Sequence, residues 1–176
     1  MKNFKSLFWV ISLLAGTQTY SQTALKPGDI APDFTAKDQD GHTVSLSNFK
    51  GKKVVLYFYP KDFTPGCTAE ACNLRDNYDK LTQSGYTIIG VSTDNISSHK
   101  EFKEKYTLPF TLVSDADSTI NQKYGVWIEK ERDGKKFWGT ARTTFLIDEK
   151  GTITQVIDKV DTQEHAKQLM SFKKAD

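Results

Sequence analysis

The sequence is poor in cysteine, and its cysteines do not form a CxxC pair. Cys67 and Cys72 are the only two among 176 residues, and five positions separate them. This spacing excludes the commoner motif of thiol-disulfide oxidoreductases, in which two residues stand between the cysteines. The sequence also lacks an internal repeat and a glycine-rich phosphate-binding loop, so neither a repeat array nor a nucleotide site is indicated.

Metal-ligand patterns are lacking as well. The three histidines, His42, His99 and His165, show no metal-ligand spacing to one another or to the cysteines. We therefore expect all three at the protein surface, in a turn, on a polar helix face and on the last helix.

The sequence has no excess of charge of one sign. It carries 24 basic and 22 acidic residues, and residues 1–21 contain two of the basic residues and none of the acidic ones. The remainder therefore has no net formal charge. Because nucleic acids and anionic membranes are bound by clustered lysine and arginine, we expect neither as a partner.

A long, mostly apolar run occurs only at the start of the chain. It covers residues 7–15, follows Lys2 and Lys5, and precedes small and polar residues. The run is too short to span a bilayer, and this order is typical of a secretory signal peptide. We predict a signal peptide over residues 1–21, export to the periplasm, and one domain over residues 22–176. The alternative is a membrane anchor or a buried N-terminal helix.

The remaining pattern predicts alternating strands and helices. Residues 54–59 form a continuous apolar and aromatic run, which is typical of a strand buried on both faces. A helix is predicted over 67–81, where Leu74, Tyr78 and Leu81 form one apolar stripe. Further strands are predicted over 86–92, 110–113, 143–148 and 152–157, with helices over 97–106 and 162–172.

This order of elements predicts an α/β fold. Strand, helix, strand and helix in succession imply a parallel sheet, and the last two strands form a hairpin. Two short strands are expected around Phe34 and Val44, and no linker divides the chain between Leu25 and Phe172. The aromatic stretch 127–138 is expected either to border a pocket or to pack as a loop on the core.

Cys67 is predicted to lie at the start of a helix, just past the end of a central strand. Unpaired backbone N–H groups and the positive end of the helix dipole favour the thiolate there. The alternative is a buried structural cysteine that acts as a small hydrophobic residue. Glu70, three residues later, is expected to support the first helical turn.

The spacing between Cys67 and Cys72 restricts the disulfide they could form. In an ideal helix an offset of five places the two Cα atoms roughly 8.6 Å apart. A disulfide requires less than about 7 Å. A bond therefore requires the helix start to unwind, and we prefer a transient disulfide over a fixed structural one. Such a pair suits oxidation of one thiolate to sulfenic acid by peroxide, followed by condensation with the other. A general thiol-disulfide exchange protein and a non-enzymatic domain with a fixed disulfide are the alternatives.

The segment from Pro60 to Cys67 has the form PxxxTPxC and resembles the active-site motif of peroxiredoxins. A second cysteine five residues on is similar to the subfamily called bacterioferritin comigratory protein or peroxiredoxin Q. The similarity continues through residues 74–76, 91–94, 125–127 and 142–148, and it covers nearly everything after the signal segment.

The resemblance implies a role for each matching residue. Cys67 would be the peroxidatic nucleophile and Cys72 the resolving cysteine. Thr64 would hydrogen-bond the peroxide, Arg142 would place a cation beside the thiolate, and Pro60 would shape the pocket.

The resemblance also implies a thioredoxin-like three-layer sandwich with a central mixed sheet, and neither a metal nor an organic cofactor. The substrate would be a hydroperoxide, the electron donor a thioredoxin-like protein, and the protein a monomer. Members of this subfamily are mostly cytoplasmic, whereas this chain begins with a predicted export segment. We therefore expect the reductant to be a periplasmic thioredoxin-like protein or another exported thiol.

Overall fold

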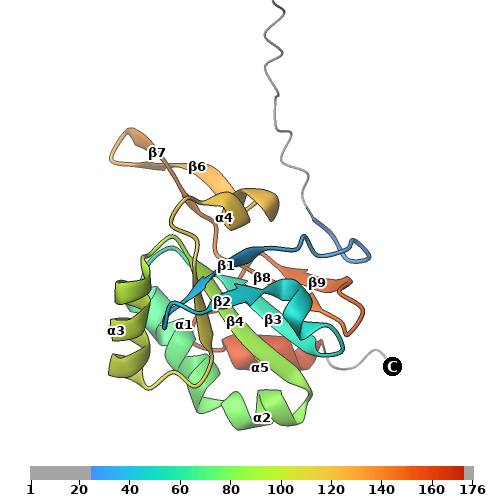
Figure 1. Cartoon of the computed structure of the whole chain (residues 1–176). Helices are drawn as coiled ribbons and strands as arrows, with labels where there is room; N and C mark the ends of the chain where they lie inside the picture. Colours follow the sequence, from blue (N-terminus) through green and yellow to red (C-terminus); the bar gives the residue numbers. More distant parts are fainter. Residues whose placement is uncertain (1–24, 173–176) are drawn as a thin grey trace, which may run out of the picture.

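A computed structural model of the chain describes residues 25–172, and the predicted signal peptide lies outside them. Seven strands form the central sheet in the order β2-β1-β5-β4-β3-β8-β9 (Figure 1). They are β1 (Thr35–Asp38), β2 (Thr43–Ser45), β3 (Lys53–Phe58), β4 (Tyr86–Ser92), β5 (Thr111–Ser114), β8 (Thr143–Ile147) and β9 (Ile153–Ile157).

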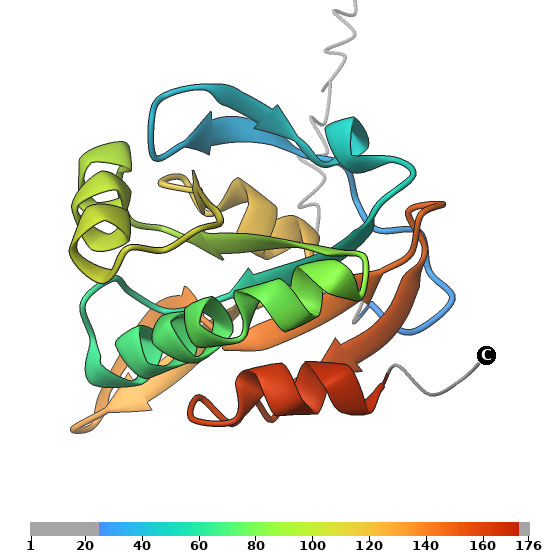
Figure 2. The same ribbon diagram turned by 90° about the horizontal axis from the view of Figure 1, so that it is seen from below.

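Helices cover both faces of this sheet. Figures 1 and 2 show α1, α2 and α5 side by side on one face. The helices are η1 (Leu46–Phe49), α1 (Pro65–Asp76), α2 (Tyr78–Gln83), α3 (Ile96–Tyr106), α4 (Thr119–Lys123) and α5 (His165–Ser171). None of the helices between residues 25 and 172 is long and apolar enough to cross a bilayer. The three-layer α/β sandwich with a mixed sheet is therefore confirmed.

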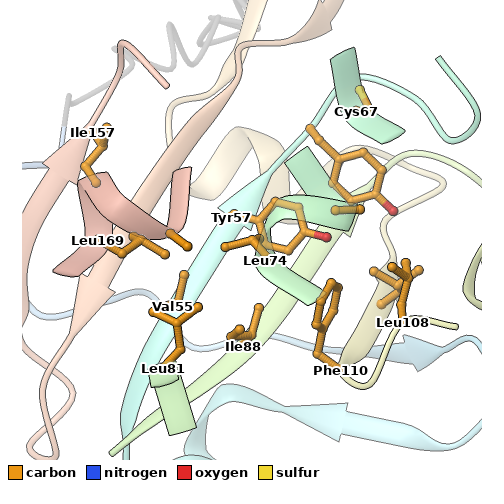
Figure 3. Packing of buried hydrophobic residues seen from close by; sticks show 14 of the residues in the cluster. Val55, Tyr57, Cys67, Leu74, Leu81, Ile88, Leu108, Phe110, Ile157 and Leu169 are labelled. Carbon is orange, nitrogen blue, oxygen red and sulfur yellow. The ribbon is translucent and has the colours of Figure 1, made fainter. Parts of the chain in front are cut away.

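The central strand β3 is buried on both faces, as its apolar run predicts. Because side chains alternate along a strand, Val55 and Tyr57 face one side while Leu56 and Phe58 face the other. The first set packs against α1, α2 and α5, with Leu74, Leu81 and Leu169 in the same cluster (Figure 3). The second set packs with Ile120 of α4.

The helix predicted over 67–81 is interrupted, which corrects that prediction. Asn77 separates α1 from α2 with φ −112° and ψ 13°. Its side-chain amide donates to the carbonyl of Asn73 at 3.0 Å, and such local bonds compete with a continuous helix. Leu74 and Leu81 are nevertheless both buried, so the predicted apolar stripe is confirmed on either side of the break.

The aromatic stretch after residue 126 is a hairpin rather than a loop. Strands β6 (Trp127–Arg132) and β7 (Lys135–Thr140) pair with each other and form a separate two-stranded sheet. Figure 1 shows this hairpin projecting from the body of the protein. Helix α4, which precedes the hairpin, was not predicted from the sequence pattern.

The direction of two neighbouring strands positions the candidate site. β3 runs parallel to β4 but antiparallel to β8, and the register pairs Phe58 with Thr143. The end of β3 therefore lies beside the start of β8. As a result, Arg142 at the start of β8 meets the segment that leads from β3 into α1.

Candidate active site

The sequence around Cys67 starts helix α1 so that this residue lies in its first turn. Thr64 is the N-cap residue in extended conformation, and Pro65 occupies the first helical turn, where its missing N–H costs nothing. Cys67 is therefore a first-turn residue, where backbone N–H groups lack helical acceptors and the helix dipole is positive. Its side chain is 2% exposed. This placement confirms the predicted helix start.

Arg142 provides a full positive charge beside the sulfur. Its Nη2 donates to Sγ of Cys67 at 3.2 Å, while its Nη1 pairs with a carboxylate oxygen of Glu70. The structure thus brings two predicted site residues, Cys67 and Arg142, into contact although they are far apart in the sequence. It also places Glu70 against Arg142.

The surroundings keep the guanidinium charged. Burial alone would lower the pKa of Arg142, but the Glu70 carboxylate and the Cys67 sulfur raise it above its usual value. The neighbouring Lys130 on β6 has a lowered pKa, because it is partly buried and lies near the Arg142 charge. Arg142 is therefore the permanent cation of the site.

A second layer of buried polar groups lies behind Arg142. Glu70 and His165 are fully buried, and Oε1 of Glu70 is 3.1 Å from Nδ1 of His165. The other ring nitrogen of His165 is 3.1 Å from the hydroxyl of Thr144 on β8. The predicted surface position of His165 is wrong, and Glu70 does more than support the helix start. The offset of three between Cys67 and Glu70 was a usable signal, because such residues share one helix face.

The loop before α1 is held by another buried histidine. Nδ1 of His99 is 2.9 Å from Oδ2 of Asp62, and the hydroxyls of Tyr59 and Ser98 each donate to this carboxylate at 2.8 Å. Because His99 is completely buried, its predicted surface position is wrong too. Phe63, next in the loop, has φ 61°, a conformation that bulky residues rarely adopt. The loop that carries Thr64 is thus tied to α3.

The other predicted site residues lie around this centre. The hydroxyl of Thr64 donates to the carbonyl of Lys61 at 2.9 Å, and Pro60 is half-buried just after β3. Cys72 is half-buried within α1. Both cysteines are free thiols in one unbroken helix, so ideal geometry places their Cα atoms roughly 8.6 Å apart, too far for a disulfide.

His42 is the one histidine at the surface, as predicted. With Asp38 and Asp40 it brings three possible metal-ligand atoms within 4.8 Å of one another. The carboxylate of Asp38 already has a structural role, because its Oδ1 accepts hydrogen bonds from the backbone N–H groups of Asp40 and His42. The Asp38 carboxylate therefore stabilises the turn between β1 and β2.

Known proteins resemble this chain closely. The sequence pattern of the AhpC/TSA family matches residues 27–156. Peroxiredoxin Bcp of Escherichia coli (strain K12) is 47% identical over 150 residues, which are 85% of this chain and 96% of that protein. Peroxiredoxin Bcp of Bacillus subtilis (strain 168) is 44% identical over 143 residues, covering 81% and 91%. A structure of the Xanthomonas campestris bacterioferritin comigratory protein, solved for insight into its alkyl peroxide reduction activity, aligns with TM-score 0.77 and 32% identity over 86% of this chain and 96% of that one.

Proposed function

Because this chain belongs to the AhpC/TSA family and is a peroxiredoxin of the Bcp type, we propose that Cys67 is its peroxidatic cysteine. The observation that carries the proposal is the 3.2 Å contact from Nη2 of Arg142 to Sγ of Cys67 in the first turn of α1. Helix N–H groups and the guanidinium together stabilise the thiolate, which is the nucleophilic form of cysteine.

In the first step, the Cys67 thiolate attacks the terminal oxygen of the hydroperoxide. An S–O bond forms as the O–O bond breaks, and the leaving oxygen takes up a proton and departs as water or an alcohol. Sulfur is oxidised to sulfenic acid and the peroxide is reduced. Arg142 faces the region where negative charge develops on the oxygens, so its interaction strengthens in the transition state.

Thr64 and Pro60 complete the pocket in this proposal. Because the Thr64 hydroxyl donates its hydrogen bond to the Lys61 carbonyl, its oxygen retains lone pairs that can accept a hydrogen bond from the O–H of the hydroperoxide. Pro60 has no N–H to bind water, and at the end of β3 it shields the pocket wall.

Cys72 resolves the oxidised cysteine. The Cys72 thiol gives up its proton and its sulfur attacks the sulfur of the Cys67 sulfenic acid. An S–S bond forms as the S–O bond breaks, and the hydroxyl leaves with that proton as water. Because the intact helix holds the two Cα atoms roughly 8.6 Å apart, the first turns of α1 must unwind for this step. A dithiol reductant of thioredoxin type then takes the disulfide by exchange and is itself oxidised.

Hydrogen peroxide and organic hydroperoxides are the proposed substrates, and the protein is proposed to act as a monomer without a metal or organic cofactor. The alkyl peroxide reduction activity of the Xanthomonas campestris relative supports the organic substrates.

Residues 1–21 lie before the family match, and their charge and apolar pattern support a signal peptide and periplasmic export. The reductant would then be an exported thioredoxin-like protein. Expression of the full chain should yield a periplasmic product whose first residue lies near Gln22, as determined by N-terminal sequencing.

Peroxide titration of the reduced protein tests the chemistry. Cys67→Ser should abolish peroxide consumption, whereas Cys72→Ser should consume about one equivalent and then stall until an external thiol is added. Thiol counting and tryptophan fluorescence follow both reactions. Turnover without Cys67 would refute its role, and unimpaired turnover by Cys72→Ser would remove Cys72 from the mechanism.

A further inference from the structure

His165 is a buried polar group that the chemistry above does not use. It is the first residue of α5, and its side chain is completely buried, which is unusual for histidine. Nδ1 lies 3.1 Å from Oε1 of Glu70 and Nε2 lies 3.1 Å from the hydroxyl of Thr144. The register of β8 with β3 pairs Thr144 with Tyr57, so both side chains face the layer formed by α1, α2 and α5.

Nδ1 of His165 and Oε1 of Glu70 lie 3.1 Å apart in the interior of the protein. Within residues 25–172, neither Oε1 of Glu70 nor Nδ1 of His165 has a hydrogen-bond partner, and the two atoms are at ion-pair distance. A buried carboxylate oxygen without a partner is costly. Nδ1 faces an oxygen that can only accept, so an N–H at Nδ1 turns the positive end of its dipole toward Glu70.

Glu70 transmits this contact to the reacting sulfur. Its second oxygen, Oε2, pairs with Nη1 of Arg142, and Nη2 of the same guanidinium donates to Sγ of Cys67. Cys67 and Glu70 lie on α1, Arg142 precedes β8, and His165 begins α5. The C-terminal helix is therefore joined to the sulfur through two intervening side chains.

We propose that His165 is a positioning residue that holds Glu70 and thereby sets how strongly Arg142 stabilises the Cys67 thiolate. Glu70 and Cys67 compete for the charge of one guanidinium. While the His165 ring stands 3.1 Å from Oε1 of Glu70, more of the Arg142 charge remains available to the sulfur. Without the His165 N–H, the Glu70 carboxylate attracts more of the Arg142 charge and draws the guanidinium away from Cys67. The proposal rests on the assigned role of Cys67.

Few other groups face His165. The Tyr57 ring on β3 stands nearly perpendicular to the imidazole, with centroids 6.3 Å apart. Burial, with help from the Glu70 and Asp62 carboxylates, raises the pKa of Tyr57 well above its usual value, so the phenol is neutral. On α5 itself, Lys167 pairs with Glu164 at the exposed surface. Glu70 is thus the charged partner that His165 contacts.

The test measures the acidity of Cys67 without turnover. In a Cys72→Ser background, the pH dependence of iodoacetamide alkylation reports the Cys67 thiolate. His165→Leu, which keeps bulk but loses the donor, should raise the midpoint by about one pH unit and slow peroxide reduction at neutral pH about tenfold. His165→Asn places an N–H near the Nδ1 position and should keep the midpoint within about 0.3 pH units of the parent.

A second buried variant separates this role from loss of stability. Asn121 is also completely buried and donates to Asp115 at 2.7 Å, in a cluster outside the active-site contacts. Asn121→Ala should lower the urea midpoint of unfolding but leave the alkylation midpoint unchanged. An unshifted midpoint in His165→Leu would overturn the proposal, and so would an equal shift in His165→Asn. A parent protein that is inert to peroxide but shows the expected alkylation shifts would refute the peroxidatic role of Cys67 and leave the link through His165 standing.

Discussion

Asp62 and His99 form a buried pair, with Oδ2 of the carboxylate 2.9 Å from Nδ1 of the imidazole and both side chains at most 1% exposed. Nε2 of His99 is also 3.2 Å from the carbonyl of Val113 on β5. The pair connects the loop before α1 to α3 and to the sheet. Since that loop carries Thr64, the pair supports the pocket from a distance.

Replacing His99 with leucine should reduce the free energy of unfolding by about 3 kcal/mol, because the buried Asp62 carboxylate loses its imidazole partner. Urea unfolding curves, monitored by tryptophan fluorescence, measure this loss. The matched control is His42→Leu, whose side chain is 78% exposed and 3.6 Å from Asp38. It should change stability by no more than about 0.5 kcal/mol. Equal losses of unfolding free energy in the two variants would show that the buried pair stabilises the protein no more than the exposed one.

Arg142→Lys should slow the reaction of Cys67 with peroxide about 100-fold while the protein stays folded. A lysine ammonium carries the same charge but cannot contact both Glu70 and Cys67 in the planar, two-pronged manner of the guanidinium. Stopped-flow tryptophan fluorescence with excess peroxide measures the rate. Arg132→Lys, on the exposed end of β6, is the control and should react at the parental rate. A parental rate in Arg142→Lys would mean that charge alone suffices.

Oxidation should unwind α1 only as far as Asn73. The side-chain amide of Asn73 clamps α1 to the segment that starts α5, because it accepts from the Ala166 N–H at 2.8 Å and donates to the Gln163 carbonyl at 2.6 Å. When the Cys67–Cys72 disulfide forms, amides of residues 66–72 should lose hydrogen-exchange protection, while amides of α5 keep theirs.

Asn73→Ala should let the unwinding spread, so that α5 amides of the oxidised variant exchange about tenfold faster than those of the oxidised parent. Asn77→Ala is the control, since its side chain donates to the Asn73 carbonyl four residues earlier and, among the described residues, has no hydrogen bond to α5. It should leave α5 protection unchanged. Protection of residues 66–72 that persists after disulfide formation would contradict the unwinding itself.

Local sequence patterns determined strand β3 and the start of helix α1, whose first turn carries Cys67. The continuous apolar run of β3 requires burial on both faces, and the proline and cysteine that follow it define a helix start with an available thiol. These features depend on neighbours within about two turns, so they could be read from the chain directly. The break at Asn77 could not be predicted from the pattern, because the apolar stripe continues across it.

The partners of the buried polar residues were decided by the tertiary structure alone. Nothing near His165 or His99 in the sequence shows that each would face a carboxylate in the interior, because those carboxylates come from α1 and from the loop before it. Arg142 reaches Cys67 because β8 runs antiparallel to β3 in a register that pairs Phe58 with Thr143. Patterning determines which residues are apolar and where helices start, whereas electrostatic contacts depend on the packing of elements that are distant along the chain.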